Sequence, residues 1–222
     1  MKKLFVSAMI KFTLGVILIG ALIFIPAGTL KFFNGWLFMG ILFIPMFIAG
    51  IIMLVRSPSL LKSRLDAKEK EKEQSIVIKL SGLMFICGFV LAGLDYRFNI
   101  LQLPRTAVFI GATLFLAAYV MYAEVLRENA FLSRTVKVQE NQTVVDSGLY
   151  GIIRHPMYSA TVILFLSIPI VLGSLISLSV FLFYPFIIAF RIKYEEKFLE
   201  RELPGYAEYK KKVKKRLIPF IW

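Results

Sequence analysis

Long apolar runs separated by short polar segments dominate the first half of the chain. Four of them, residues 12–27, 35–55, 76–94 and 106–126, are long enough to cross about 30 Å of hydrocarbon as helices. In lipid such runs form helices, because every backbone polar group has to be hydrogen-bonded within its own segment. The pattern therefore predicts four transmembrane helices in residues 1–126. We expect the first helix to be retained, because no clear small-residue cleavage site follows it.

A fifth apolar run is too long for one crossing. Residues 159–190 contain no charged side chain, and a straight helix of about 1.5 Å per residue would exceed the hydrocarbon thickness by more than half. A single crossing would also leave the basic tail after it on the outer face, against the positive-inside rule. We therefore predict a helical hairpin that turns near Gly173 and Ser174.

This hairpin brings two polar segments together at the membrane surface. Arg154 and His155 precede it, whereas Arg191, Glu195 and Glu196 follow it. With a cytoplasmic amino terminus, most lysines and arginines lie on the cytoplasmic side, so we expect the cluster to face the cytoplasm. Ionisable groups at membrane depth suggest a functional site, although composition alone equally allows side chains that only anchor helices at the interface.

The whole chain is predicted to be one all-α integral membrane domain, 1–222. Residues 1–126 supply the four helices, and residues 127–222 supply the hairpin and an amphipathic cytoplasmic tail. Apolar tail residues recur at helix-like spacing and are interrupted at 203–205; they are Leu199, Leu203, Tyr206, Tyr209, Val213 and Leu217. The charged segment 62–73 is expected to form a solvated helix. Gly82, Gly88 and Gly93 offer close helix contacts, within one chain or between chains.

Composition and charge narrow the function. Apolar residues make up 58% of the 222, and the basic residues behind the net charge of +13 cluster between and after the apolar runs, so they indicate membrane topology and not nucleic-acid binding. The lysines of the tail are also expected to contact anionic lipid headgroups. Cys87 is the single cysteine and His155 the single histidine, which gives no basis for a disulfide or a metal site. Glycine-rich nucleotide-binding motifs and a serine nucleophile elbow are absent from the sequence.

Four short motifs in a fixed order suggest a family. The chain contains "RHPMYSA", then the apolar hairpin, "RIKYEEKFL", "PGYAEYKKKV" and "RLIPF". Over residues 139–222 it resembles the isoprenylcysteine carboxyl methyltransferases and the related phospholipid methyltransferases, which are integral membrane enzymes that use S-adenosylmethionine. Ala160 departs from the pattern, where the family usually has glycine, and its methyl group would narrow any close backbone approach.

The resemblance also implies site residues. Those expected to line the S-adenosyl-L-methionine pocket are Gln139, Gln142, Thr143, Val144, Val145, Tyr150, His155, Pro156, Met157, Tyr158 and Glu195. Arg191 is expected to face the methyl acceptor, and we assign Arg191 and Glu196 as catalytic. No metal is expected, and the partner is a lipidic or prenylated acceptor.

The chemistry favours a carboxylate acceptor. A carboxylate is ionised at neutral pH and needs no base, and arginine can orient it through two parallel hydrogen bonds. An aminolipid such as phosphatidylethanolamine is the alternative acceptor; its amine must lose a proton, which requires a base such as Glu196 or His155. Two further alternatives are a sterol-reductase-like oxidoreductase and a membrane subunit without enzymatic activity.

Overall fold

The computed structural model describes residues 2–65, 72–133, 135–136, 138–219 and 222. In chain order the helices are α1 (Lys2–Ala27), α2 (Phe33–Arg56), α3 (Pro58–Leu65), α4 (Lys72–Phe98), α5 (Arg105–Glu128), the 3-10 helix η1 (Gly148–Gly151), α6 (Pro156–Leu172), α7 (Leu175–Phe181), α8 (Tyr184–Glu202) and α9 (Tyr206–Lys212). Among the described residues the only β-type pairing is an isolated bridge between Gln102 and Ser174. The predicted all-α fold is confirmed.

Within the part of the chain that the structure describes, five segments are long and apolar enough to cross a membrane. They are Lys2–Ala27, Phe33–Arg56, Gln74–Phe98, Arg105–Glu128 and Leu175–Glu202, the last comprising α7 and α8 together. Each of the first four contains one predicted span and extends beyond it, because helices continue into polar flanks where hydropathy alone sees no span. Half of the charged segment 62–73 predicted as a solvated helix, residues 66–71, lies outside the described residues.

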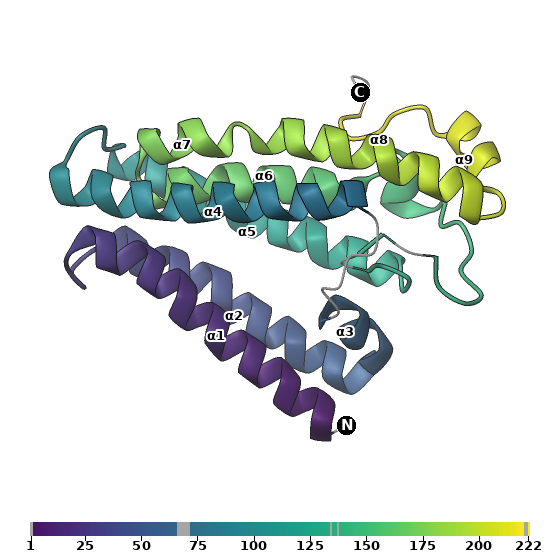
Figure 1. The fold of residues 1–222 in the computed structure, drawn as a ribbon, viewed down its shortest axis with the longest axis horizontal. Helices are drawn as coiled ribbons and strands as arrows, with labels where there is room; N and C mark the ends of the chain where they lie inside the picture. The colour runs from purple at the N-terminus through teal and green to yellow at the C-terminus, as the bar shows by residue number, and fades with distance from the viewer. Residues whose placement is uncertain (1, 66–71, 134, 137, 220–221) are drawn as a thin grey trace.

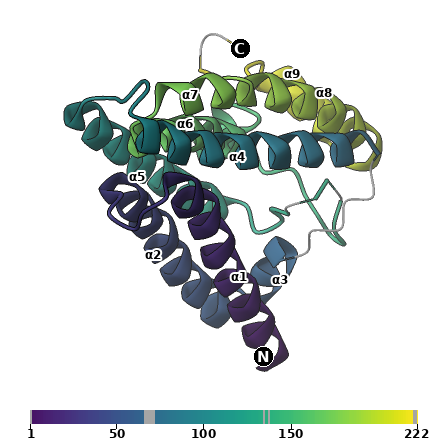
Figure 2. The same ribbon diagram turned by 60° about the vertical axis from the view of Figure 1, so that its left-hand side comes forward.

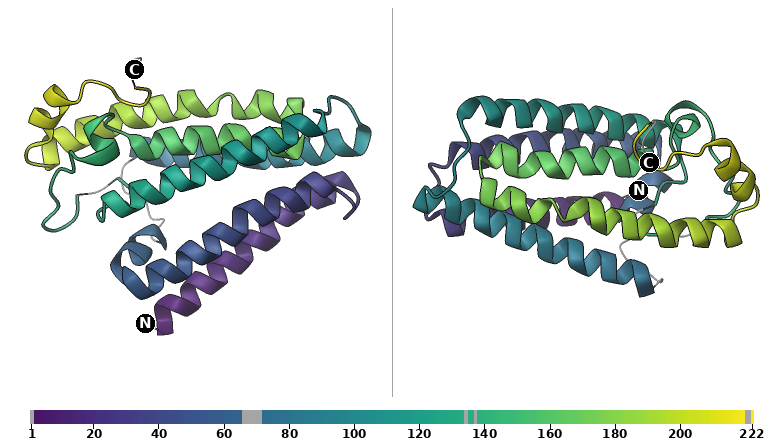
Figure 3. Two further views of the ribbon diagram at one scale, coloured as in Figure 1. Left: turned by 180° about the vertical axis from the view of Figure 1, so that it is seen from behind. Right: turned by 90° about the horizontal axis from the view of Figure 1, so that it is seen from above.

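The helices form two groups that diverge from one end of the molecule. Figures 1 and 2 show α1 and α2 side by side, splayed away from a second group that contains α4 to α8. Within that second group α6 lies between α5 and the α7–α8 pair, as the view from above in Figure 3 shows. The hairpin arm that begins at Pro156 is thus enclosed by protein and starts at the end where α9 and the carboxyl terminus lie.

Glycines allow some of these helices to approach closely. A β-carbon on Gly93 would lie 2.5 Å from the carbonyl oxygen of Ile23, so α4 could not pack as closely on α1. A β-carbon on Gly88 would lie 2.3 Å from the Phe181 ring. Gly82 has no atom within 4 Å of such a position. Two of the three glycines singled out in the sequence therefore serve packing inside the chain.

The hairpin turns where the sequence predicts. Gly173 has φ of 76°, in the left-handed region that favours glycine, and ends α6. The Ser174 hydroxyl caps α7 by accepting a hydrogen bond from the Ser177 amide, at 3.1 Å. The same hydroxyl donates to the fully buried carboxylate of Asp95, at 2.5 Å. The turn is therefore tied to α4 through a charge-assisted hydrogen bond.

The tail folds back on the protein instead of extending from it. α8 ends at Glu202 and α9 starts at Tyr206, so the interruption predicted at 203–205 is present. The apolar side chains of Leu203, Tyr206, Tyr209 and Val213 form a small core of their own. This core packs on Val144 from the loop before η1, and it thereby closes the end of the bundle.

Candidate functional site

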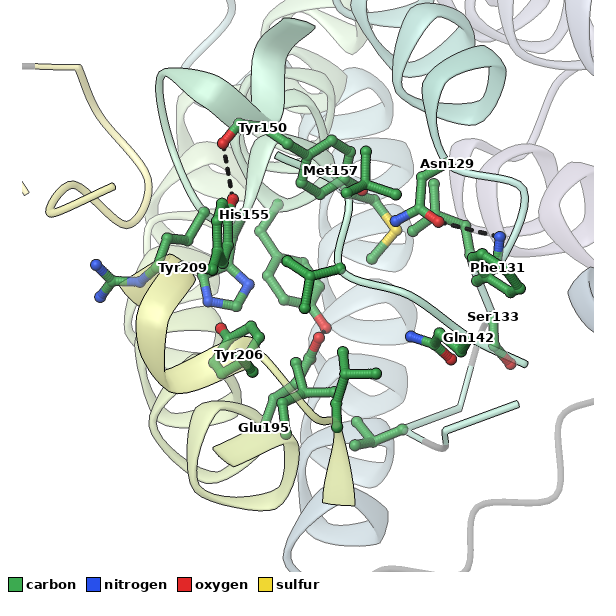
Figure 4. A pocket seen from close by; sticks show the side chains of 18 of the residues that line it. Asn129, Phe131, Ser133, Gln142, Tyr150, His155, Met157, Glu195, Tyr206 and Tyr209 are labelled. Carbon is green, nitrogen blue, oxygen red and sulfur yellow. Dashed lines mark hydrogen bonds between the residues drawn. The ribbon is translucent and has the colours of Figure 1, made fainter. Parts of the chain in front are cut away.

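A cavity opens at the end of the bundle opposite the hairpin turn. Its walls come from the loop after α5, from η1 and the start of α6, and from α8 and α9 (Figure 4). It holds about 800 Å³ when its open mouth is included. The lining residues are Asn129, Phe131, Leu132, Ser133, Thr135, Val136, Gln142, Thr143, Val144, Val145, Tyr150, Arg154, His155, Met157, Tyr158, Arg191, Glu195, Leu199, Leu203, Tyr206 and Tyr209.

One wall of the cavity is fixed by a buried carboxylate. Glu196 is 2% exposed and receives hydrogen bonds from Arg154 at 2.8 Å and from Arg216 at 3.1 Å. His155 Nε2 lies 3.1 Å from the same oxygen as Arg154. Hydrogen bonds from these partners offset the free-energy cost of burying the carboxylate. They also cross-link α8, the segment before α6 and the tail. Glu196 itself does not line the cavity.

A second carboxylate, one residue earlier, faces the cavity. The Tyr158 hydroxyl donates a short hydrogen bond to Glu195 and accepts one from Arg191 Nε, at 2.6 Å. Arg191 Nε and Glu195 Oε2 are 3.9 Å apart, one helical turn along α8. Arg191 is 8% exposed, and α4 supports its backbone because Gln74 Nε2 donates to the Arg191 carbonyl at 3.3 Å. The three side chains present a cation, a carboxylate and a phenol on one wall.

The loop before η1 holds its own shape. The Gln139 amide donates to the Gln142 side-chain oxygen at 2.9 Å, and the Gln142 amide donates back to the Gln139 carbonyl at 3.1 Å. The Gln139 side chain also donates to the Phe131 carbonyl. These bonds fold residues 139–142 into a turn, with Asn141 at φ of 57°. Gln139 therefore shapes the loop, whereas Gln142 and Thr143 reach the cavity.

Three tyrosines line the side of the cavity near the tail. Tyr209 donates to the Tyr150 carbonyl at 2.7 Å, which joins α9 to η1 (Figure 4). The Tyr206 hydroxyl is buried and has no hydrogen-bond partner within the described part of the chain. Burial raises the pKa of Tyr150, Tyr206 and Tyr209, so all three phenols stay protonated at physiological pH. An unused buried hydroxyl is a polar group that a ligand can satisfy.

A tight contact with α5 positions η1. Gly148 has φ of 54°, and a β-carbon there would lie 1.7 Å from the Glu128 carboxylate. That carboxylate instead accepts the Leu149 amide hydrogen at 3.0 Å. The glycine is thus required for the approach that orients Tyr150 toward the cavity.

Most residues assigned to the site from the sequence lie together. Of the predicted set, Gln142, Thr143, Val144, Val145, Tyr150, His155, Met157, Tyr158, Arg191 and Glu195 line the cavity. Three do not: Gln139 shapes the loop, Pro156 begins α6 with the fixed φ that suits a first helical residue, and Glu196 lies in the buried ionic cluster. Glu196 is saturated by cations in this position and is not placed as a base beside the cavity.

Part of the cavity lining was not predicted from the sequence. Tyr206 and Tyr209 stand in the "PGYAEYKKKV" motif, but helix-like spacing marked them only as packing residues. Six lining residues of the loop after α5 belong to no motif, and only the folded loop brings them to the cavity: Asn129, Phe131, Leu132, Ser133, Thr135 and Val136. Ala160 is fully buried and does not line the cavity, so its methyl group is accommodated in helix packing.

Residues 106–204 match the model of a family described as phospholipid methyltransferase. The matched segment runs from α5 to the end of α8, so it starts earlier than the resemblance seen in the sequence and stops before α9. It includes the loop after α5, η1, α6 and α8, which supply most of the cavity walls. No match was found among curated proteins. Residues 106–204 therefore match the phospholipid methyltransferase domain, which is typical of a family of integral membrane methyltransferases.

Proposed function

We propose that the protein is an S-adenosylmethionine-dependent methyltransferase that methylates the carboxylate of a membrane-embedded, lipidic acceptor such as an S-prenylated cysteine. One observation carries the proposal: Arg191, Tyr158 and Glu195 are joined by hydrogen bonds on the wall of a cavity within a methyltransferase-family domain. The family supports methyl transfer to a lipid-related substrate, and the side chains support the choice of acceptor.

The cavity's chemistry fits the cofactor. Glu195 offers a carboxylate to a cationic or hydroxyl group, and the Tyr206 hydroxyl is buried and unpartnered among the described residues. Gln142 and Thr143 add neutral polar groups from the loop. When bound, S-adenosylmethionine supplies an electrophilic methyl group on a sulfonium; a carboxylate oxygen forms the new bond as the carbon–sulfur bond breaks, leaving a methyl ester and a neutral thioether. These residues would hold its polar groups, while Tyr150 and Met157 supply apolar surface.

Arg191 is the residue we assign to the acceptor. Its guanidinium lies against the Tyr158 ring, with the carbon 5.7 Å from the ring centre, and its Nε is engaged by the Tyr158 hydroxyl. A side chain held in this way is ordered before the acceptor arrives, so less conformational entropy is lost on binding. Guanidinium and carboxylate then meet in a directional contact that orients the attacking oxygen. No base is required, because the acceptor is already ionised.

The aminolipid alternative is favoured by a different observation. Glu195 Oε2 lies 3.9 Å from Arg191 Nε and partly compensates the charge of the guanidinium. This wall of the cavity therefore repels a cationic amine less than an isolated arginine would. The family description, phospholipid methyltransferase, points to the same substrate class. An amine needs a base, however, and Glu196 is already bound by Arg154, Arg216 and His155 outside the cavity. We therefore rank the carboxylate first.

We also propose that the cavity faces the cytoplasm. The end of the bundle that holds it carries exposed lysines of α9, among them Lys211 and Lys212. The positive-inside rule assigns such an end to the cytoplasmic side. The water-soluble cofactor would then enter from the cytoplasm, and the lipidic acceptor from the bilayer.

A two-substrate assay tests the assignment. Purified protein is incubated with methyl-labelled S-adenosylmethionine and either an S-prenylated cysteine acid or phosphatidylethanolamine, and label in the lipid phase is counted. We expect methyl ester formation with the acid, reduced about a hundredfold in Arg191→Lys, because lysine lacks the planar fork. Arg201→Lys, on the exposed side of α8, is the matched control and should retain activity. Label in phosphatidylethanolamine alone would replace the first acceptor by the second.

A further inference from the structure

A second hollow lies on the outer side of the ionic cluster, between α9 and the carboxyl-terminal tail. It is lined by Arg154, Lys210, Lys214, Lys215, Arg216 and Trp222. Five of these six side chains are cationic and none is acidic. Arg154 also lines the first cavity, so a single guanidinium borders both. We call this second hollow the basic hollow.

The basic hollow has more positive charge than its surroundings neutralise. Glu196 is shared among Arg154, Arg216 and His155, and Lys210 is paired with Glu200 at 2.6 Å. Neither Lys214 nor Lys215 has a carboxylate partner within the described residues. Cationic side chains gathered in a concave site produce a local positive potential that attracts anions.

The hollow is built on fixed backbone and not on a loose tail. The Arg154 amide donates to the Lys215 carbonyl and the His155 amide to the Arg216 carbonyl, both at 2.9 Å. Arg154 Nη1 donates to the Val213 carbonyl at 2.7 Å. These bonds hold residues 213–216 of the tail against the segment that leads into α6. The basic side chains are therefore kept together before any anion arrives.

The rim of the hollow is apolar and exposed. Trp222 lines the hollow and is 37% exposed, and the Arg216 guanidinium carbon lies 5.6 Å from the centre of its ring. Ile218, which is 47% exposed, is joined to Trp222 because its amide donates to the Trp222 carbonyl at 2.8 Å. Tryptophan beside basic residues is typical of the membrane–water interface, where the ring lies at the level of the headgroups. A soluble anion gains nothing from such a rim, whereas a phospholipid places its phosphate against the cations and its glycerol and chains against the apolar side chains.

We infer that the basic hollow binds the phosphate of an anionic phospholipid headgroup, such as that of phosphatidylglycerol, as a site separate from the methyl-transfer cavity. The phosphate oxygens accept hydrogen bonds from Arg216, Lys214 and Lys215. Because Arg216 and Arg154 share the Glu196 carboxylate with His155, a bound headgroup also stabilises one wall of the first cavity. The inference does not depend on the proposed methyl transfer, since lipid retention and thermal stability are read without any cofactor.

Lipid retention by the full-length protein is the direct test. The detergent-purified protein is mixed with equal amounts of phosphatidylglycerol and phosphatidylcholine, and retained lipids are counted by native mass spectrometry. We expect preferential retention of one phosphatidylglycerol, and the double variant Lys214→Gln with Lys215→Gln should bind it on the order of tenfold more weakly. The double variant Lys2→Gln with Lys3→Gln removes the same charge from exposed positions on α1 and should match wild type.

A thermal-stability measurement separates the lipid from a free anion. Phosphatidylglycerol should raise the melting temperature of wild type and of the Lys2 and Lys3 variant, but not that of the Lys214 and Lys215 variant. Glycerol 1-phosphate at the same concentration should produce little change. Equal retention of both lipids, or equal stabilisation by glycerol 1-phosphate, would overturn the assignment of the hollow to a lipid headgroup.

Discussion

A buried carboxylate lies near each end of α6, Asp95 on α4 and Glu196 on α8, yet only one end carries a cavity. At the turn, Asp95 is 0% exposed and its two oxygens accept hydrogen bonds from the Leu101 amide and the Ser174 hydroxyl. At the other end Glu196 is equally satisfied by arginines. The difference is Glu195, whose carboxylate lies on a cavity wall. Burial with complete hydrogen bonding marks a structural tie, whereas polar groups that face a cavity mark a site for a ligand.

The largest expected loss of stability follows removal of the Glu196 carboxylate, at the end of α6 that carries the cavity. Glu196→Gln leaves Arg154 and Arg216 without their carboxylate, and the free energy of unfolding should fall by on the order of 3 kcal/mol. Thermal denaturation in detergent, followed by circular dichroism, measures the change. Glu195→Gln is the matched control on the neighbouring residue and should keep a melting temperature close to wild type. Equal melting temperatures for both variants would mean that the ionic cluster contributes no stability.

Replacing Asp95 at the hairpin turn should lower the stability less and leave the cavity unchanged. Asp95→Asn keeps the size of the side chain but removes the charge from two hydrogen bonds, so we expect a loss of about 2 kcal/mol. The dissociation constant for S-adenosylmethionine should stay within about twofold, because the cavity lies at the opposite end. Denaturation and calorimetry on the same preparation check both statements; a large loss of affinity would contradict the separation of the two ends.

Two tyrosines of α9 show the same difference between a group that faces a ligand site and a group that stabilises the fold. Tyr206→Phe removes a hydroxyl that has no partner among the described residues, so stability should hold while cofactor affinity falls about fivefold. Burial raises the pKa of Tyr206, so the hydroxyl remains a donor and this loss should be the same at pH 7 and pH 9. Tyr209→Phe should instead lower the melting temperature, because its hydroxyl donates to the Tyr150 carbonyl. The opposite result, with lower stability in Tyr206→Phe and lower cofactor affinity in Tyr209→Phe, would contradict these assignments.

The smallest effect is expected at Ala160. The residue is fully buried in α6 and does not line the cavity. Ala160→Gly should therefore lower the free energy of unfolding by less than about 1 kcal/mol, through backbone entropy and lost packing. Affinity for S-adenosylmethionine should not change, as titration calorimetry would show. A gain in affinity would mean that the methyl group narrows the cofactor's approach after all.

The apolar pattern predicted much of the fold because lipid leaves so few options. Long apolar runs marked the four spans, and the combination of run length and tail charge placed the hairpin turn near Gly173 and Ser174. Helix ends were less predictable, since α1 extends back to Lys2, well before the predicted start of the first span at residue 12. The divergence of α1 and α2 from the other helices depends on packing that the pattern does not describe.

Site residues that belong to a motif could be predicted from the sequence. Residues that only the folded loop and tail bring to the cavity could not. Tyr158, Arg191 and Glu195 were assigned from their motifs, and the structure places them in contact. Glu195 and Glu196 are adjacent in the sequence, and their different surroundings appear only when the tail brings Arg216 to one of them. The cavity-lining residues of the loop after α5, such as Asn129 and Thr135, belong to no motif, because their contribution depends on position and not on a distinctive residue type.

The most direct test of the central claim is calorimetric titration of S-adenosylmethionine into wild type, Glu195→Gln and Asp95→Asn. The account predicts binding to wild type and Asp95→Asn with similar affinity, and binding to Glu195→Gln that is at least about tenfold weaker. Absence of binding to folded wild-type protein, or equal binding by all three, would contradict the assignment of the cavity that Glu195 lines as the cofactor site.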